Sequence, residues 1–220
     1  MKKYFFIIIF FIFSYTVIAQ EKDNFSDYLS HYKEVQLPYE MSLDSIWTIF
    51  PRNIIPKDYV LKYICEPGKP CDDDVIKYEY CYGFKINLGK YIAVILSKYC
   101  TAYDECTTEF GIGIAKYFIM VYTLDGKMMS QSVFAQVSDQ HFSYVFFEED
   151  HDSNGLLCVS TKQGTIYDYL DKINSIYKGV MDYYTYIINQ KGAIKKEKNR
   201  STNIRISWGL KGVELLKEWE

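Results

Sequence analysis

The chain lacks the short motifs that mark the common enzyme classes. It contains no HExxH pair, no GxSxG elbow, and no GxxxxGK[ST] or GxGxxG loop. The usual sequence signs of a zinc protease, an α/β-hydrolase and a nucleotide-binding fold are therefore missing. No CxxC spacing occurs, and no histidine lies near the close cysteine pairs, which disfavours a zinc site. These absences favour a non-enzymatic protein that needs no cofactor.

Long apolar runs are absent after residue 19. The one such run, at residues 4–13, follows Lys2 and Lys3 and gives way to polar sequence after Ala19. This order predicts a secretory signal peptide over 1–19 and a mature chain that begins at Gln20. An uncleaved anchor is the alternative, but the run is shorter than the ~20 residues that span a bilayer. We expect an exported, periplasmic or extracellular protein with no transmembrane segment in its mature chain.

Alanine and arginine are scarce, whereas lysine, isoleucine, tyrosine, phenylalanine and asparagine are abundant. This bias is typical of an AT-rich genome and points to a bacterial source. The formal net charge is −3 and becomes −5 once the two lysines of the signal are removed. A mildly acidic protein has no global attraction to nucleic acid or to an anionic membrane. We expect neither as a partner.

One segment is strongly basic although the chain as a whole is acidic. Residues 191–200 carry four lysines and one arginine, and three tyrosines lie just upstream at 183–186. Cations beside aromatic rings can bind a single nucleic acid strand. Alternating lysines also protect an edge strand from aggregation. For an exported acidic protein we favour the edge strand.

The six cysteines all lie in the predicted mature chain. An even number of cysteines in an exported protein favours disulfides. Two pairs each enclose five residues, and the first of them contains Pro-Gly, which turns the chain back on itself. The predicted bridges are Cys65–Cys71, Cys100–Cys106 and, from the two cysteines that remain, Cys81–Cys158. Other connectivities stay open, because six cysteines allow 15 of them.

The chain divides into a helical lead-in over 20–66, an antiparallel β region over 72–208 and a C-terminal helix over 209–220. Apolar residues at i, i+3, i+4 and i+7 predict a helix over 24–33, and a second helix is predicted over 56–64 with proline at its start. The β region is rich in β-branched and aromatic residues between turn signals. We predict one domain with a mainly β fold.

Two turn signals define hairpins in this β region. Asp125-Gly126 and Lys191-Gly192 each separate two strand-like segments. Residues 166–178 fit either a helix or a strand. Successive antiparallel strands with short links predict a meander sheet that forms a sandwich or a partly closed barrel, with short N-terminal helices and a short C-terminal helix.

The most specific local pattern is the acidic loop at 150–155. Its sequence DHDSNG matches D-x-[DN]-x-[DN]-G, the first half of a calcium loop, with Asp150, Asp152 and Asn154 as candidate ligands. Thr161 stands where a full loop has a bidentate glutamate, so Glu148 or Glu149 would have to complete the site. The alternative is a solvated turn, because these residue types also favour turns.

The chain is rich in tyrosine, with 22 residues. Exposed tyrosines on a rigid sheet bind proteins or sugars at low entropic cost. We therefore expect an exported, non-enzymatic protein that binds a protein or a glycan at the cell envelope or outside the cell. One alternative is a secreted hydrolase that uses the loop at 148–155 as a metal or carboxylate site. A second alternative is a disulfide-stabilised inhibitor module.

Overall fold

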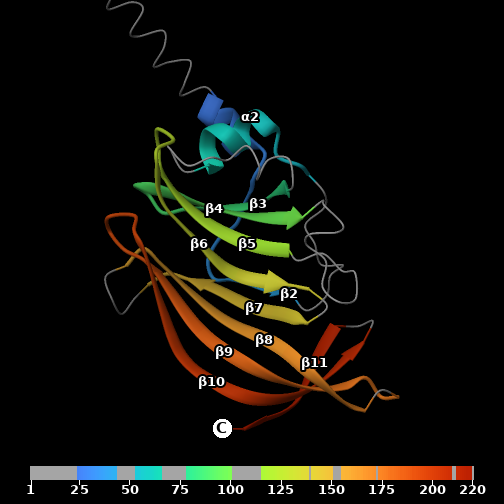
Figure 1. Cartoon of the computed structure of the whole chain (residues 1–220). Helices are drawn as coiled ribbons and strands as arrows, with labels where there is room; N and C mark the ends of the chain where they lie inside the picture. The colour runs from blue at the N-terminus through green and yellow to red at the C-terminus, as the bar shows by residue number, and fades with distance from the viewer. Residues whose placement is uncertain are drawn as a thin grey trace, which may run out of the picture.

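The computed structural model describes residues 24–43, 53–65, 78–100, 115–138, 140–150, 155–171, 173–209 and 212–219. Two β-sheets pack face to face, and helices lie on the outer face of one of them (Figure 1). The mainly β, largely antiparallel fold predicted from the sequence is confirmed.

We call the five-stranded sheet with the order β1-β3-β4-β5-β6 sheet A. Its neighbours pair antiparallel except β1, which runs parallel to β3. The predicted hairpin at Asp125-Gly126 joins β5 to β6, and Gly126 has the positive φ of 92° that such a tight turn needs. The strands of sheet A are β1 (Lys33–Glu34), β3 (Tyr78–Asn87), β4 (Tyr91–Cys100), β5 (Ala115–Thr123) and β6 (Met128–Val137).

We call the six-stranded sheet with the order β11-β10-β9-β8-β7-β2 sheet B, and all its neighbours pair antiparallel. The predicted hairpin at Lys191-Gly192 joins β9 to β10. Its strands are β2 (Tyr39–Leu43), β7 (His141–Glu148), β8 (Leu157–Asp171), β9 (Ile176–Ile188), β10 (Ile194–Gly209) and β11 (Gly212–Trp219).

Sheet A is buried on both faces, which explains the continuous apolar sequence of its central strands. On β4, Ala93 and Ile95 face sheet B, whereas Val94 and Leu96 face the helices. The core between the sheets is completed from sheet B by residues such as Phe147 and Tyr186. The alternation along each strand therefore builds two separate apolar layers.

The helical layer contains the helix at 24–30, α2 (Lys57–Tyr59) and the π-helical turn η1 (Val60–Ile64). Both predicted N-terminal helices are thus present. Tyrosines dominate the contact with sheet A: the Tyr28 and Tyr32 hydroxyls lie 2.6 Å apart, and the Tyr122 hydroxyl donates to the carbonyl oxygen of Tyr63 at 2.6 Å. Burial raises the pKa of Tyr28 well above its usual value. These tyrosines form a core layer and are not exposed platforms.

The far half of sheet B curls on itself, as the orange and red strands in Figure 1 show. The Phe142 and Trp208 rings, on β7 and β10, lie 5.8 Å apart, and the Tyr144 hydroxyl on β7 donates to the Val213 carbonyl oxygen on β11 at 3.0 Å. Inside this curl lies a third buried cluster: Phe142, Ile166, Met181, Ile204 and Ile206. We call this region the curled end of sheet B.

The predicted C-terminal helix is wrong. Residues 212–219 form strand β11, which pairs with β10 from Asn203↔Trp219 to Gly209↔Gly212. The free edge of β10 offers this segment backbone hydrogen bonds that local helix propensity does not outweigh. The ambiguous segment at 166–178 is also extended, because it forms the end of β8, a turn and the start of β9.

Candidate functional site

The curled end is the candidate functional site because it combines a polar cluster with exposed apolar side chains. Two glycines permit the curl. A Cβ on Gly164 would lie 2.0 Å from the Phe142 ring, and one on Gly179 would lie 2.4 Å from the Thr165 carbonyl oxygen. No side chain fits in either space, so glycine is required where β8 and β9 curve.

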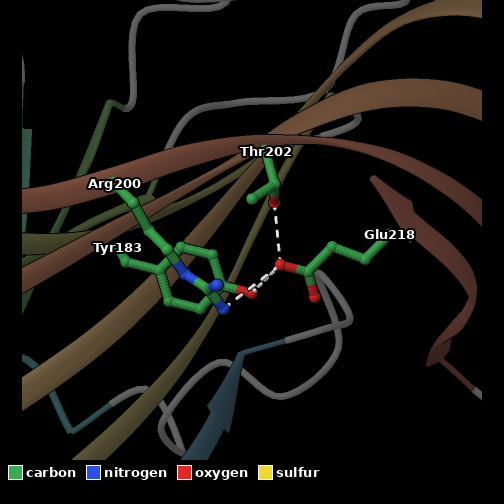
Figure 2. A network of polar contacts seen from close by, with 4 residues as sticks. All are labelled: Tyr183, Arg200, Thr202 and Glu218. Carbon is green, nitrogen blue, oxygen red and sulfur yellow. Dashed lines mark hydrogen bonds and ion pairs between the residues drawn. The ribbon is translucent and has the colours of Figure 1, made fainter. Parts of the chain in front are cut away.

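The polar cluster contains Tyr183, Arg200, Thr202 and Glu218 (Figure 2), and Tyr183 also packs against the buried core of the curl. Three groups converge on Oε1 of Glu218: the Tyr183 hydroxyl at 2.6 Å, the Thr202 hydroxyl at 2.9 Å and the Arg200 guanidinium at 3.3 Å. The Arg200 guanidinium also lies 4.2 Å from the centre of the Tyr183 ring. Residues from β9, β10 and β11 are thereby tied together.

The electrostatics of this cluster keep Glu218 ionised. The Tyr183 hydrogen bond is the main cause that lowers the pKa of Glu218; partial burial opposes it, while Thr202, Arg200 and Lys162 reinforce it. Burial and the same hydrogen bond raise the pKa of Tyr183. A carboxylate held in this way is a poor proton donor, because a general acid needs a raised pKa. These contacts instead hold the edge strand β11 against β9 and β10. We call Tyr183, Arg200, Thr202 and Glu218 the clasp.

The β8–β9 hairpin carries exposed apolar side chains. We call residues 167–171 and 173–176 the hairpin tip. Ile173 is 94% exposed, and three other large apolar side chains in the tip are also exposed: Tyr167 at 59%, Tyr169 at 46% and Leu170 at 41%. Several exposed large apolar side chains within one short hairpin are a candidate interaction surface.

Hydrogen bonds hold the hairpin tip in a defined shape. Asp171 Oδ1 accepts from the backbone N–H groups of Ile173 and Asn174 at 2.9 and 3.2 Å, and its Oδ2 accepts from the Asn174 amide at 2.7 Å. Behind the turn, the Tyr169 and Tyr177 rings lie 4.3 Å apart, and their hydroxyls are joined at 2.9 Å. The apolar side chains are therefore presented on an ordered turn.

The predicted calcium loop lies only partly within the described residues. Asp150 Oδ2 accepts from the Gly155 backbone N–H at 2.7 Å, and a Cβ on Gly155 would lie 2.1 Å from that oxygen. Asp150 thus closes the loop onto its final glycine. Asp152 and Asn154 lie outside the described residues, so calcium binding here stays a prediction. Among the described residues, no three acidic, histidine or cysteine side chains gather as a metal site would require.

Of the three predicted disulfides, only one has both of its cysteines among the described residues. Cys71 and Cys106 lie outside the described residues, so the Cys65–Cys71 and Cys100–Cys106 bridges stay predictions. Cys81 is buried on β3 of sheet A, and Cys158 lies on β8 of sheet B. No disulfide joins these two described residues, which contradicts the predicted Cys81–Cys158 bridge. The strand register that separates them cannot be read from cysteine spacing.

The basic stretch at 191–200 lies at a sheet edge among the described residues, because β11 pairs with β10 only from Asn203 to Gly209, and residues 194–202 pair with β9 alone. Its cations also contact tyrosine rings and acids. Lys196 Nζ lies 4.2 Å from the Tyr184 ring centre, and Lys198 Nζ lies 2.8 Å from Asp182 Oδ1. The position of these lysines therefore agrees with the edge-strand interpretation.

The exposed hairpin tip and the Glu218 cluster were both missed from the sequence. Residues 166–178 gave a mixed pattern, and Glu218 was placed in a helix that does not form.

Comparison with protein-family models, curated proteins and solved structures finds no significant match to this chain. The described residues also include no helix that is long and apolar enough to cross a membrane. The curled end must therefore be interpreted from its own chemistry.

Proposed function

We propose that this chain is an exported, non-enzymatic protein of the cell envelope or cell exterior, and that it binds a protein partner through the hairpin tip. The observation that carries this proposal is the exposure of Ile173, which is 94% accessible on a turn held by Asp171. An isoleucine on a mobile tail would mean little. An isoleucine fixed at the apex of a hydrogen-bonded hairpin is preorganised for binding.

The composition of the hairpin tip supports a protein partner. Tyrosine presents a large amphipathic surface and loses little conformational entropy on binding, and the exposed Tyr167 and Tyr169 precede the exposed Leu170 and Ile173 along the hairpin. The carboxylate nearest the apex, Asp171, is already hydrogen-bonded within the turn. The partner is therefore expected to offer an apolar groove that takes Leu170 and Ile173, with polar groups at its rim.

A photo-crosslinking amino acid at position 173 tests this proposal in cells of the native host. We expect one discrete cross-linked protein, and we expect it to disappear when Leu170→Ser is added. Position 124 is the matched control, because Leu124 is 57% exposed at the turn between β5 and β6 and lies outside the hairpin tip. Equal cross-linking at 124 and 173, or none at 173, would contradict the proposal.

Export is tested separately from partner binding. Amino-terminal sequencing of the protein recovered from the native host is expected to give a chain that starts at Gln20. An intact Met1 in a cytoplasmic fraction would overturn the export proposal and leave the binding proposal standing. The two parts of the proposed function can therefore fail independently.

A further inference from the structure

Three cations stand side by side on neighbouring strands of the curled end. In the strand register, Arg205 on β10 lies directly opposite Lys178 on β9 and directly opposite Lys217 on β11. Directly opposed residues share a face of the sheet, with Cβ atoms about 5 Å apart. We call Lys178, Arg205 and Lys217 the cation row. Like charges in this position repel one another and disfavour the folded sheet.

The cation row faces solvent on the outside of the curl. Ile204 and Ile206 flank Arg205 along β10, and both are fully buried in the interior of the curl. Because side chains alternate along a strand, Arg205 points to the opposite, outer face. Arg205 and Lys217 are exposed, and Lys178 is partly exposed.

The cation row has no ion-pair partner among the described residues, whereas several cations of the basic stretch do. Lys195, Lys198 and Arg200 each lie within ion-pair distance of an acid: Glu197 at 2.5 Å, Asp182 at 2.8 Å and Glu218 at 3.3 Å respectively. Within the described part of the chain, no acid lies at such a distance from Lys178, Arg205 or Lys217. Asp168 is opposite Lys178 in the register and makes no ion pair with it. The three charges of the cation row therefore exceed the single directly opposed carboxylate, that of Asp168.

An aromatic ring and an amide adjoin the cation row on the same outer face. Asn203 precedes Arg205 by two residues and lies opposite Trp219, which follows Lys217 by two residues. The Lys217 ammonium lies 5.8 Å from the centre of the Trp219 ring. Trp219 is partly exposed at the edge strand. One small patch thus holds a ring for stacking, an amide for hydroxyl groups and three cations.

We propose that this patch binds an acidic saccharide. A sugar ring stacks on Trp219, its hydroxyls hydrogen-bond to the Asn203 amide, and its carboxylate or sulfate lies against Arg205 and Lys217. Arginine and lysine form their strongest hydrogen bonds with such anions, and a bound anion relieves the repulsion within the cation row. The patch adjoins the hairpin tip, because Asp168 of the tip lies opposite Lys178 in the register, but the two share no residue and the saccharide proposal does not depend on the proposed protein partner.

The composition of the patch favours a saccharide over other polyanions. The chain as a whole carries a net charge of −3, so attraction of an anionic ligand is confined to local basic surfaces such as this patch. Nucleic acid binding relies on several stacking rings along a basic groove, whereas this patch has one ring, Trp219. An acidic peptide would use the cations but would gain little from the ring and the amide together.

Titration calorimetry with the purified full chain tests the proposal. The probe is an oligomer of galacturonic acid, with its methyl ester as the uncharged counterpart. We expect the acid to bind and its affinity to fall as salt rises, because screening weakens contacts between exposed charges. We expect the methyl ester to bind at least about tenfold more weakly, since a lost charged hydrogen bond changes affinity by that order. A sulfated oligosaccharide run alongside separates carboxylate from sulfate as the preferred anion.

Variants assign any binding to the patch. Arg205→Gln and Trp219→Leu are each expected to weaken binding of the galacturonic acid oligomer by about tenfold or more. Lys195→Gln is the matched control, because Lys195 is an exposed cation on the same strand that lies outside the patch, and it is expected to bind as the parent does. Arg205→Gln is also expected to melt at the same or a higher temperature, since it removes like-charge repulsion.

Four results would overturn the proposal. One is binding of neither acidic saccharide probe. Another is binding of polyglutamate or single-stranded DNA at least as tight as that of the acidic saccharides. The third is a Lys195→Gln variant that loses binding as much as Arg205→Gln does. The fourth is an Arg205→Gln variant that loses binding only because it melts at a lower temperature.

Discussion

The hydroxyl of Tyr144, on β7, donates to the carbonyl oxygen of Val213, on β11, at 3.0 Å. These two strands are separated by β8, β9 and β10 in the order of sheet B. The contact therefore joins parts of the sheet that would be far apart if it were flat. It closes the curl around the buried cluster that contains Phe142 and Ile204.

Removing this hydrogen bond tests whether it stabilises the curl. Tyr144→Phe keeps the ring, which lies 5.9 Å from the Phe142 ring, and removes only the hydroxyl. We expect the free energy of unfolding to fall by about 1 kcal/mol, the usual net value of one hydrogen bond. Urea denaturation followed by tryptophan fluorescence measures it. An unchanged midpoint would show that the curl does not depend on this contact.

The clasp at Glu218 predicts a dependence of stability on pH. Because the pKa of Glu218 is lowered from 4.5 in the folded state, its stabilising effect is fully present above the unfolded pKa and is lost as pH falls through the folded pKa. Glu218→Gln should therefore lower stability by about 1 kcal/mol at neutral pH. The difference in the free energy of unfolding between the parent and Glu218→Gln should shrink as the pH falls below 4.5.

Thermal melting at a series of pH values measures this difference. Other lowered carboxyl pKa values, such as that of Asp171, remain in both proteins, so only the difference between parent and variant is informative. Glu214→Gln on the same strand makes none of the contacts to Tyr183 or Thr202 and should behave as the parent. A Glu218→Gln difference that is the same at neutral and acidic pH would argue against an ionised clasp.

Close packing against Gly164 predicts a large effect from one added methyl group. In Gly164→Ala the new Cβ would overlap the Phe142 ring, which is fully buried. Overpacking of this kind is expected to cost about 1–3 kcal/mol. Gly209→Ala is the control, because a Cβ there has nothing within 4 Å. Equal urea midpoints for the two variants would show that Phe142 does not occupy this position.

The remaining cysteine predictions are open to peptide mapping without reduction. We expect linked peptides for Cys65–Cys71 and Cys100–Cys106. We expect no peptide that links Cys81 to Cys158, since the two lie on different sheets and are not bridged. A Cys81–Cys158 peptide from protein kept in acid during digestion would contradict the arrangement of the sheets.

Much of the architecture was predictable because it depends on local sequence. The Asp125-Gly126 and Lys191-Gly192 turns fixed two hairpins, and the apolar spacing at 24–33 fixed a helix. Strand β11 was mispredicted because its spacing of Val213, Leu216 and Trp219 also fits a helix, and only the edge of β10 favours the strand. Local pattern fails where pairing with a distant strand decides the conformation.

The candidate sites were harder to predict than the fold. Lys178, Arg205 and Lys217 are scattered along the sequence and become neighbours only through the register of three strands. The bulges in these pairings shift the register by one residue and cannot be located from composition. Ile173 was visible as an apolar residue in an ambiguous segment, but its exposure depends on the turn that Asp171 forms.

The tyrosine layer over sheet A has a consequence for the order in which the chain folds. Tyr28, in the first described helix, packs against Tyr63 and Tyr122, whose ring centres lie 4.8 and 6.3 Å away. Tyr122 belongs to β5, so this helix has no complete surface to dock on until β5 has been synthesised. Until then the aromatic side chains of the helix remain uncovered. Contacts between residues this far apart in the sequence form slowly. The aromatic side of this helix therefore stays accessible to other chains until sheet A is assembled.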